Sequence, residues 1–407
     1  MRIILSHPTG NTFVRANLGG LKKANMLEEF HTTIACFPNT LLDLISNIGA
    51  LKELKRRQYH SELKSITYTY PFLELGRLGL GKYFKKLTEH ERGIFCLDAI
   101  YKSLDLKVAC AINNNKNING VYAYEDGALY SFREAKKKGI ECFYDLPIAF
   151  WKERKKLITE ESIRLPLWRN TLGGGVNDSE EKLNRKSEEL ELSDVIIVPS
   201  EFVKNTLPTF DRPKRVIVAP FGSPTNYPKL PIEKNKNKPL RVLFAGSMGQ
   251  RKGLGDLFDA FKLLNNKNIE LIVMGIPIVP IHFYKNQYRQ FIYESPRAHN
   301  EVLELMKSCD IFCLPSIVEG RALVMQEAMS QGLPLIITAN TGGEDLIIEG
   351  ETGFLVPIRN PEKIAEKLNW LYENRNELDR MSIMAQKHAM EYSWKKYSDL
   401  IIEGISN

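Results

Sequence analysis

Short apolar segments alternate with stretches of helical pattern, and they do so in two separate regions of the chain. In the first region the apolar segments are residues 2–6, 139–145 and 194–200; in the second they are residues 240–246, 270–275 and 310–316. Strands that alternate with helices form parallel sheets, which need helices on both faces. We therefore predict an α/β protein with two doubly wound, Rossmann-like domains that face a central cleft.

A stretch rich in proline, asparagine and lysine separates the two regions and marks a linker. The chain of 407 residues is also too long for one ordinary hydrophobic core. We predict an N-terminal domain at residues 1–222, a linker at 223–238 and a second domain at 239–390. In such sheets ligands bind beyond the carboxyl ends of the strands, so functional residues are expected where strands end.

Composition excludes several classes of protein. Hydrophobic residues make up 43% of the chain and charged residues 26%, as in a globular protein. No apolar run approaches the roughly 20 residues of a membrane span, and the apolar start of the chain is too short for a signal peptide. The six cysteines have no metal-ligand spacing, which predicts reduced core cysteines in a cytoplasmic protein. No nucleic-acid-binding module is recognisable.

Positive charge is concentrated in the first half. Residues 1–220 hold 34 lysines and arginines against 27 acidic residues, which accounts for the whole net charge of +7. An aromatic and leucine-rich patch at residues 68–80 lies between basic clusters at 52–57 and 82–86. Basic residues beside exposed aromatics can hold a protein on an anionic leaflet, although solvated helix faces over a normal core would give the same pattern. An anionic membrane surface is therefore one expected partner.

Two glycine-rich loops in the second region are suited to anions. Gly246-Ser-Met-Gly-Gln-Arg-Lys-Gly253 follows one strand and precedes a helix, and Asn340-Thr-Gly-Gly343 follows another strand. Open backbone amides, a helix N-terminus and a lysine together make an anion cradle. The order of residues in the first loop is not that of a P-loop. These glycines could also serve tight turns alone, but their place at strand ends favours a phosphate site.

Two glutamates, Glu319 and Glu327, are separated by seven residues. The second lies on a predicted helix, residues 323–330, and the first lies at its mouth, where unpaired N–H groups favour anions. A helix running between the two would place both carboxylates on one face. A loop glutamate, a helix N-terminus and a second glutamate together suit a sugar joined to a phosphate.

These motifs resemble the donor domain of retaining, GT-B-fold glycosyltransferases of family 4, the glycosyl transferases group 1. The resemblance covers residues 190–400 well and the start of the chain mainly in layout. It rests on segments 245–253, 314–320, 324–334, 340–343 and 353–357. The closing stretch, residues 391–407, resembles the family's final helix, which crosses back to the N-terminal domain.

The resemblance implies a role for each matching position. Glu327 would accept hydrogen bonds from the ribose of a nucleotide-diphosphate sugar, and Glu319 would lie near the transferred sugar. Lys252 would neutralise the diphosphate leaving group without a metal, since no Asp-x-Asp in a suitable setting is present. The donor site would comprise Gly246, Ser247, Arg251, Lys252, Glu319, Gly320, Arg321, Ala322, Leu323, Glu327, Thr341 and Gly342.

The chain departs from the family pattern at two places. Ser247 stands where the family commonly has an arginine, and Arg251 is the nearest substitute. Residues 144–147 lack the histidine that often follows a first-domain strand. Catalytic help for the acceptor would come from Glu125, expected to point from a strand end into the cleft, from His7, or from the departing phosphate. The remaining acceptor-side candidates are Gly10, Asn11 and Asp126, of which Asp126 could also be an ordinary helix N-cap.

The expected function is retaining, metal-independent transfer of a sugar from a nucleotide-diphosphate donor to a glycan or lipid-linked glycan, in surface polysaccharide synthesis. No cofactor is expected. The protein would be cytoplasmic, and peripheral on the inner face of the membrane if the basic aromatic patch binds lipid. Two alternatives remain open: a non-catalytic partner subunit that binds sugar nucleotides, and another GT-B enzyme such as a nucleotide-sugar epimerase.

Overall fold

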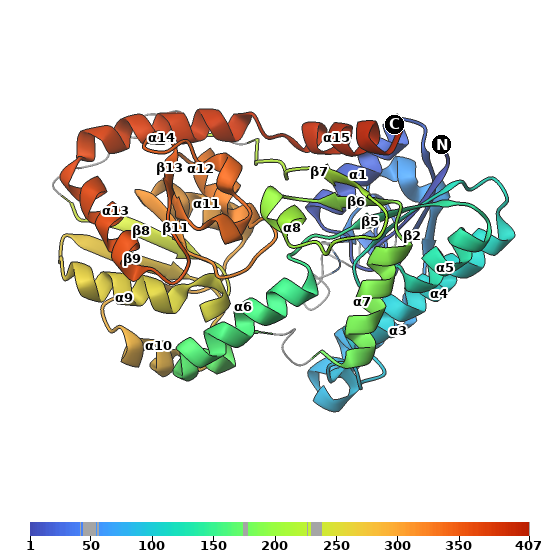
Figure 1. The fold of residues 1–407 in the computed structure, drawn as a ribbon, viewed down its shortest axis with the longest axis horizontal. Coiled ribbons are helices and arrows are strands. Elements are labelled where there is room, and N and C mark those ends of the chain that lie inside the picture. Colours follow the sequence, from blue (N-terminus) through green and yellow to red (C-terminus); the bar gives the residue numbers. More distant parts are fainter. Residues whose placement is uncertain are drawn as a thin grey trace.

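A computed structural model describes residues 1–40, 42–43, 54, 57–173, 178–225, 227–228 and 238–406. Within these residues the chain forms two α/β domains side by side, each built on a parallel sheet (Figure 1). The two sheets predicted from the alternation of strands and helices are therefore confirmed.

The first sheet has the order β3-β2-β1-β4-β5-β6-β7, and its strands pair in parallel. The order reverses at β1, as in a doubly wound sheet. Its strands are β1 (Ile3–Ser6), β2 (Leu27–Thr32), β3 (Thr67–Thr69), β4 (Gly120–Tyr124), β5 (Glu141–Asp145), β6 (Val195–Val198) and β7 (Arg215–Val218). The helices between them are α1 (Thr12–Lys23), α3 (Phe72–Gly79), α4 (Leu97–Asn114), α5 (Leu129–Lys137), α6 (Trp151–Arg164), α7 (Glu180–Leu192) and α8 (Glu201–Asn205), with 3-10 turns η2 (Ser61–Ile66), η3 (Leu80–Lys82), η4 (Lys85–Thr88) and η5 (Pro166–Thr171).

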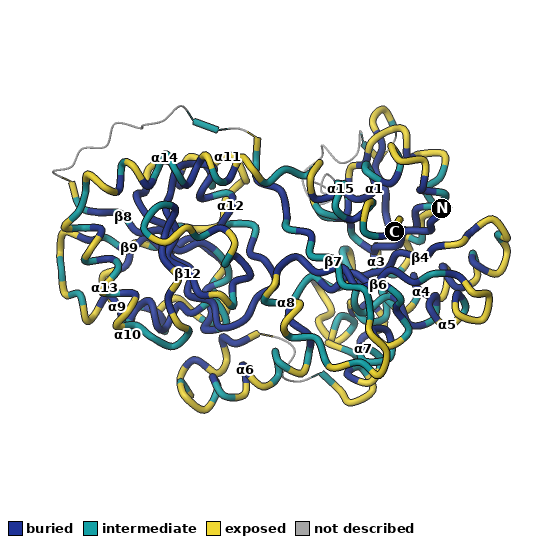
Figure 2. Tube along the Cα trace, turned by 45° about the horizontal axis from the view of Figure 1, so that its top comes forward, coloured by how far each residue is buried: buried dark blue, intermediate teal, exposed yellow. Residues whose placement is uncertain are grey.

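Alternate side chains of the first sheet enter two separate hydrophobic clusters. One cluster joins β1 to α1 and to the last helix, α15 (Trp394–Ser406). The other joins β4, β5 and β6 to α4, α5 and α7. The central strands β1, β4, β5 and β6 are accordingly buried, while the outer faces of the helices are exposed (Figure 2). Because successive side chains of a strand point to opposite faces of the sheet, this alternation fixes which face of each strand packs on which helices.

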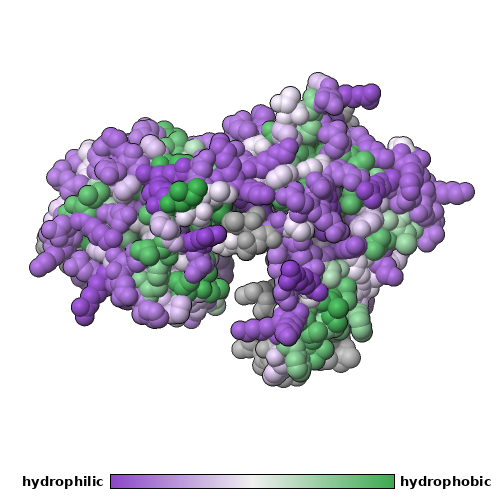
Figure 3. Space-filling view, turned by 60° about the horizontal axis from the view of Figure 1, so that its bottom comes forward, coloured by the Kyte–Doolittle hydropathy of each residue, from purple (hydrophilic) through white to green (hydrophobic). Residues whose placement is uncertain are grey.

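The second sheet has the order β10-β9-β8-β11-β12-β13, again with parallel pairing. A deep notch separates the lower parts of the two domains in the space-filling view (Figure 3). The strands are β8 (Leu240–Ala245), β9 (Ile269–Met274), β10 (Ile292–Glu294), β11 (Ile311–Leu314), β12 (Leu335–Ile337) and β13 (Gly353–Leu355). The helices are α9 (Leu254–Leu264), α10 (Ile281–Gln287), α11 (His299–Lys307), α12 (Leu323–Ser330), α13 (Pro361–Glu373) and α14 (Arg375–Met390), with η6 (Gln250–Lys252), η7 (Ala339–Thr341) and η8 (Glu344–Leu346).

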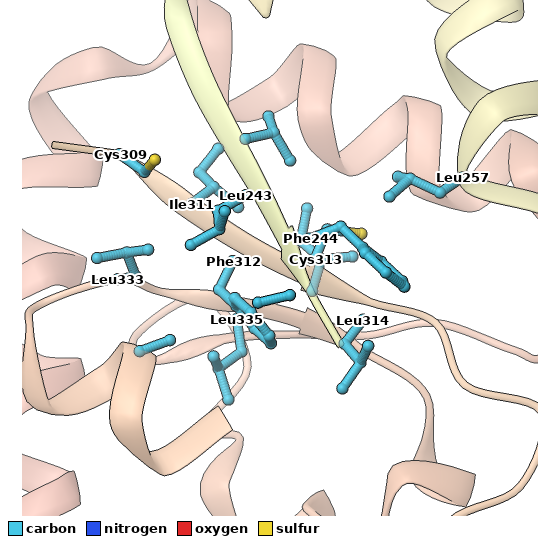
Figure 4. Close-up of a cluster of buried hydrophobic side chains, with 14 of the residues drawn as sticks. Leu243, Phe244, Leu257, Cys309, Ile311, Phe312, Cys313, Leu314, Leu333 and Leu335 are labelled. Carbon is cyan, nitrogen blue, oxygen red and sulfur yellow. The ribbon is translucent and has the colours of Figure 1, made fainter. Parts of the chain in front are cut away.

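The core of the second domain is a close-packed apolar layer on β8 and β11. One cluster contains Leu243, Ile311, Phe312, Leu333 and Leu335, on and around these strands (Figure 4). Each of these five residues is fully buried. The continuous apolar character of β11 follows from this position, because a central parallel strand is covered on both faces.

The end of the chain crosses from the second domain to the first. Helix α14 lies on the second domain and α15 lies on the first, as a nearly continuous run along one edge of the molecule (Figure 1). Helix α15 packs on α1, where a Cβ on Gly20 would lie 2.6 Å from Cβ of Ser398. A side chain at Gly20 would therefore force these two helices apart.

A second crossing involves α6 and η5. These elements lie between β5 and α7 in the chain, within the domain predicted at residues 1–222. Even so, Trp168 of η5 is buried in the hydrophobic core of the second domain. Its ring meets the rings of Phe283 at 5.1 Å and Phe258 at 5.8 Å between centroids. Trp168 thereby anchors η5 in the second domain, whereas the start of α6 stays on the first domain, where the Trp151 ring N–H donates to the Ser187 hydroxyl at 3.0 Å.

Some expectations fall on residues outside the description. Of the predicted linker at 223–238, residues 226 and 229–237 are not described, and neither are Lys52, Lys55 and Arg56 of the first basic cluster. All six cysteines are free. Five are buried as expected, but Cys110 is exposed on α4. The expectation of a core position is wrong there, because Cys110 falls on the outward face of its helix.

Candidate functional site

The loop after β8 carries the two predicted cations and depends on glycine at both ends. Gly246 has a φ of 149° and Gly253 a φ of 74°, conformations that favour glycine. A Cβ on Gly253 would also lie 2.0 Å from the carbonyl oxygen of Pro315. The loop is thereby pressed against the end of β11, and the 3-10 turn η6 presents Arg251 and Lys252 at this position.

Glu319 follows β11 and forms ion pairs with both cations. Its Oε1 lies 2.7 Å from Nζ of Lys252 and also contacts the guanidinium of Arg251. The Glu319 N–H donates to the carbonyl oxygen of Asn340, which fixes the backbone. Burial lowers the pKa of Lys252, while the charge of Glu319 opposes this effect. The structure thus brings together three charged residues that were predicted for the donor site.

Arg251 is placed to supply the second cation that Ser247 cannot. The Arg251 guanidinium also donates to the carbonyl oxygen of Val318, 3.3 Å away. Ser247 is half-buried in the same loop, and its carbonyl oxygen accepts from the N–H of Gly249 at 2.8 Å. The reach of Arg251, which sequence alone left uncertain, therefore extends to Glu319.

Most backbone amides of the two glycine-rich loops are already engaged. They donate to carbonyl oxygens of the protein. Those of η6 and η7 close the hydrogen bonds of the 3-10 turns, while those of Gly246 and Met248 donate to Met274 and Ile276, at and after the end of β9. The expected cluster of open amides is wrong at these positions, and side-chain cations carry most of the positive charge. The engaged amides are those of Gly246, Met248, Gly249, Lys252, Gly253, Thr341 and Gly342.

No helix joins the two glutamates. Helix α12 begins at Leu323, with Ala322 as its extended N-cap residue. The N–H of Ala322 donates to the carbonyl oxygen of Thr341 at 3.3 Å, which holds this approach in place. The helical spacing argument is therefore wrong: Glu327 lies on α12, whereas Glu319 lies before it.

The segment around Gly320 is one of the places where the two domains touch. A Cβ on Gly320 would lie 1.8 Å from the carbonyl oxygen of Pro147, after β5. The Ser200 hydroxyl donates to the carbonyl oxygen of Gly320 at 2.7 Å. Gly342, at a φ of 70°, is equally close, because a Cβ there would lie 1.7 Å from the same Gly320 oxygen. The Glu319 site therefore sits directly beside the junction of the domains.

Arg321 is engaged in internal contacts. Its side chain is fully buried and its guanidinium contacts Asp345 at 2.6 Å, Gln326 at 3.0 Å and the carbonyl oxygen of Gly342 at 3.1 Å. The same group lies over the ring of Tyr392. These contacts hold the loop 339–345 against the start of α12, so the Arg321 side chain stabilises the site rather than facing a ligand.

Glu327 is half-buried on α12, and burial raises its pKa. Nδ1 of His299, at the start of α11, lies 3.6 Å from its carboxylate. Sequence reasoning missed His299. His299 lies 28 positions before Glu327, and no spacing rule links the two residues. Only the packing of α11 beside α12 brings the two together.

His7 lies in the first domain and is held as a neutral hydrogen-bond acceptor. The N–H groups of Thr9 and Gly10 donate to its Nδ1 at 3.2 and 2.8 Å. Burial and the charge of Arg57 lower its pKa to about 3. Its ring also packs edge-on against Tyr124 at 4.8 Å. With Nδ1 occupied, only Nε2 remains to meet a substrate.

The neighbouring acceptor-side candidates shape the loop after β1. Gly10 has a φ of 60°, and a Cβ there would lie 1.9 Å from the hydroxyl of Tyr59. Asn11 is the N-cap of α1, and its side chain accepts from the N–H of Val14 at 3.1 Å. Both residues are therefore accounted for by local structure.

Glu125 and Asp126 are bound by cations of α7. Lys186 lies 3.3 Å from Glu125 and 3.4 Å from Asp126, and Arg185 lies 2.7 Å from Asp126. The expected free projection of Glu125 into the cleft is not seen, because its carboxylate is buried in this ion pair. Burial raises its pKa, with Lys186 opposing the effect. The N-cap alternative for Asp126 is wrong, since Ala128 precedes α5.

A sequence signal for these cations did exist. Lys182, Lys186 and Glu189 recur at helical spacing and so share one face of α7. Glu189 is fully buried, accepts from the N–H groups of Asp126 and Ala128, and has a pKa raised by burial to about 8. The result is a buried charged network that ties α7 to the end of β4.

Within the described residues, one cluster has ligand atoms close enough for a metal ion: His90, Glu91 and Asp178. It lies in the first domain. Asp178 is already paired with Arg154 at 3.3 Å and Lys182 at 3.4 Å. These cations neutralise the cluster, which accordingly has the character of a salt-bridge network.

Two doubly wound domains with charged residues at the strand ends of the second define the GT-B fold. A solved structure agrees over the whole chain: Anabaena HepE in complex with UDP has a TM-score of 0.62 and 14% identity, with 100% of both chains covered. At this identity the likeness establishes the fold alone.

Residues 228–388, which include most of the second domain, match the family described as glycosyl transferases group 1. A D-inositol 3-phosphate glycosyltransferase of Corynebacterium glutamicum is 30% identical over 185 residues, 41% of this chain and 44% of that protein. The capsular polysaccharide biosynthesis glycosyltransferase CapM of Staphylococcus aureus is 27% identical over 201 residues, 44% of this chain and 53% of that protein. The matched region thus spans about half of each relative.

Proposed function

We propose that this protein is a retaining, metal-independent glycosyltransferase of family 4 that transfers a sugar from a nucleotide-diphosphate donor. The observation that carries the proposal is the ion-paired group of buried Glu319 with half-buried Arg251 and Lys252 at the carboxyl ends of β8 and β11. Two cations gathered on one carboxylate suit a ligand that brings a diphosphate and a sugar to the same point. The relatives named above are glycosyltransferases by description.

The cations would act on the leaving group. Breaking the bond between the sugar and the diphosphate leaves negative charge on the phosphate oxygens. Lys252 and Arg251 would stabilise that charge in a site from which water is largely excluded, where fixed charges act most strongly. Since they are already held by Glu319, little reorganisation is needed when the donor binds. No metal ion is required in this scheme.

Glu319 would act on the sugar and Glu327 on the nucleotide. Glu319 is oriented by two cations on one side, which leaves its remaining lone pairs for sugar hydroxyls or for positive charge that develops at the anomeric carbon. Glu327 would accept from the ribose hydroxyls, with His299 beside it. Both roles need ionised carboxylates, and the charge of His299 opposes the effect of burial on Glu327.

The acceptor proton would pass to the departing phosphate. An acceptor hydroxyl oxygen forms a bond to the anomeric carbon on the face that the diphosphate leaves, the bond from that carbon to the phosphate oxygen breaks, and the proton moves to the phosphate. Retention follows from attack on this face. His7 is an unsuitable base because its Nδ1 is occupied and its pKa is far below neutral. Glu125 is tied to Lys186.

For the acceptor we propose a glycan or lipid-linked glycan of surface polysaccharide synthesis, handled at the inner face of the cell membrane. The first domain exposes a tip of large apolar side chains on and after α3: Phe72 at 78%, Tyr83 at 81%, Phe84 at 59% and Ile94 at 61%. Figure 3 shows hydrophobic side chains gathered on this protruding part of the domain. Exposed Lys85, Lys86 and Arg92 lie among them. No helix of the described residues has the length and apolarity to cross a bilayer.

Vesicle flotation tests the membrane part. We expect binding to phosphatidylglycerol vesicles at low salt and little binding to phosphatidylcholine, because each lysine or arginine near an anionic surface contributes about 1 kcal/mol. Phe84→Ser should weaken flotation several-fold, whereas Leu167→Ser, at a residue that is 71% exposed on η5, should not. Equal flotation of the two variants would remove the tip from the proposal.

The glycosyltransferase part is tested by a thermal-shift screen of UDP-, GDP-, ADP- and dTDP-sugars. The hydrolysis rate of each nucleotide sugar that stabilises the protein is then measured. A true donor at about 100 times its Kd should stabilise the folded state by about 2.7 kcal/mol. Binding without any turnover, with or without an acceptor, would favour the non-catalytic subunit. Absence of both stabilisation and hydrolysis would contradict the proposal.

A further inference from the structure

The α6–η5 segment, residues 151–171, leaves the first domain and holds the second domain beside the candidate donor site. Its anchor is Trp168, which is 4% exposed and packs among Phe258, Phe283 and Tyr284. Burying a ring of this size removes a large apolar surface from water, which stabilises the docking of η5 on the second domain. Residues that follow Trp168 on η5 are therefore fixed relative to the second domain.

A buried ionic group fixes the last turn of α6, a few residues before Trp168. Glu161 of α6 is fully buried and accepts from Arg164 of its own helix and from Arg359 of the second domain, whose Nε lies 2.8 Å from Oε2. Arg164 also contacts Asp256 of α9 at 2.8 Å. Removal of one member would leave buried charge uncompensated, which is strongly destabilising. The segment is therefore docked by charge as well as by apolar packing.

Gln250 links this group to the loop that carries the cations. Its amide nitrogen donates to Glu161 at 2.8 Å and to Asp256 at 2.6 Å, and its Oε1 accepts from the N–H of Gly255 at 2.7 Å. Gln250 is fully buried and directly precedes Arg251. Each hydrogen-bonding group of its side chain is thus used to hold the turn η6.

Thr171 of η5 also contacts the turn η6. The backbone N–H of Gln250 donates to the Thr171 hydroxyl at 3.0 Å, and that hydroxyl donates to the carbonyl oxygen of Trp168 at 2.7 Å. A Cβ on Gly249 would lie 2.3 Å from the carbonyl oxygen of Thr171. The glycine is therefore required for this close approach, and the approach sets the position of η6.

The opposite side of the segment supports Glu319. Leu157, Ile158 and Leu172 form an apolar cluster with Ile317 and Val318, the two residues before Glu319. Both partners of the Glu319 ion pairs are thus supported by residues 151–172: the cations through Thr171 and Gln250, and the carboxylate through Ile317 and Val318.

We propose that residues 151–172 form a positioning clamp for the donor site, and that Thr171 and Gln250 are positioning residues that set Arg251 and Lys252 against Glu319. This inference rests on the proposed function for the nature of the ligand, a nucleotide diphosphate. The placement of the turn itself does not depend on that function, because each contact named above is made within the protein.

Thr171→Val tests the clamp, because it keeps the side-chain volume and removes the hydroxyl that accepts from Gln250. Thr171→Ser keeps that hydroxyl. Thr206→Val is the matched control: the Thr206 hydroxyl also donates to a carbonyl, that of Val203 at 2.6 Å, and accepts from an N–H, that of Phe150 at 2.9 Å, but away from the donor loop. The readouts are hydrogen exchange of residues 246–253, the melting temperature, and kcat and KM with the donor from the thermal-shift screen.

We expect Thr171→Val to lower kcat/KM for the donor by about 10- to 100-fold, as a displacement near 1 Å can do, and to speed exchange of residues 246–253. Thr171→Ser should stay near wild type, and Thr206→Val should lower the melting temperature similarly without either effect. If hydrogen exchange of residues 246–253 is the same in Thr171→Val as in Thr206→Val, the clamp proposal is wrong, whatever reaction the protein catalyses. If exchange rises as expected but wild type binds no nucleotide sugar, the proposed function fails and the clamp stands.

Discussion

Replacing Lys252 with methionine tests the charge arrangement most directly. Methionine keeps an apolar stem in the space of the lysine and removes the ammonium. In the wild type this ammonium lies 2.7 Å from a carboxylate oxygen, and a diphosphate oxygen would lie at a comparable separation. At an effective dielectric constant of about 20, two unit charges at that separation interact by about 6 kcal/mol.

Only part of that interaction accelerates the reaction. The diphosphate is already charged in the bound donor, and roughly half a further charge develops on it as the bond breaks, which leaves about 3 kcal/mol for the transition state. That corresponds to about a 150-fold lower kcat, within the 10²–10³ range typical of one preorganised donor. Folding should be preserved, because Arg251 still pairs with Glu319 and the burial cost of a charged Lys252 disappears.

The assay is release of nucleoside diphosphate from saturating donor, with circular dichroism melting as the check on folding. Lys262→Met is the matched control, since Lys262 lies on the exposed face of α9 and pairs only locally with Asp259 at 2.8 Å. Wild-type activity should also fall at alkaline pH sooner than an ordinary lysine would cause, because burial lowers the pKa of Lys252. A Lys252→Met enzyme within threefold of wild type would refute the electrostatic role.

Two further predictions concern the junction of the domains and the first sheet. Gly320→Ala places a Cβ 1.8 Å from the Pro147 carbonyl oxygen, so we expect a loss of about 1–3 kcal/mol in unfolding free energy or a larger radius of gyration by X-ray scattering. Gly19→Ala, with open space around it, should show neither effect. Identical melting curves and radii of gyration for the two variants would contradict the contact. Burial raises the pKa of Asp145 to about 7, so the folded protein binds a proton that the unfolded chain releases at lower pH. The free energy of unfolding should therefore decline as pH rises toward 7, by up to about 1.4 kcal/mol per pH unit. Asp145→Asn should flatten this slope in urea unfolding at pH 5, 6 and 7, and an unchanged slope would place the titration elsewhere.

The donor half was predictable to a large extent because its signals are local. Helix α12 begins at Leu323, as the good helix formers there indicate, and Gly246 follows β8 where the apolar run ends. The first half was less predictable. Glu125 was expected in the cleft because it follows a strand, but its orientation depends on Lys186, 61 positions further along the chain. A strand end identifies where a side chain starts and not which partner it meets.

The amino-acid sequence by itself determined two parallel sheets, the glycine-bounded loop and the positions of the two glutamates. Such features depend on periodicity and turn chemistry within a few residues. Only the tertiary structure decided that Arg251 reaches Glu319, that His299 lies beside Glu327, and that Trp168 enters the second core. The physical reason is that apolar burial has no direction: a large apolar side chain such as Trp168 gains from burial in either core, and the packing of the whole chain decides which core receives it.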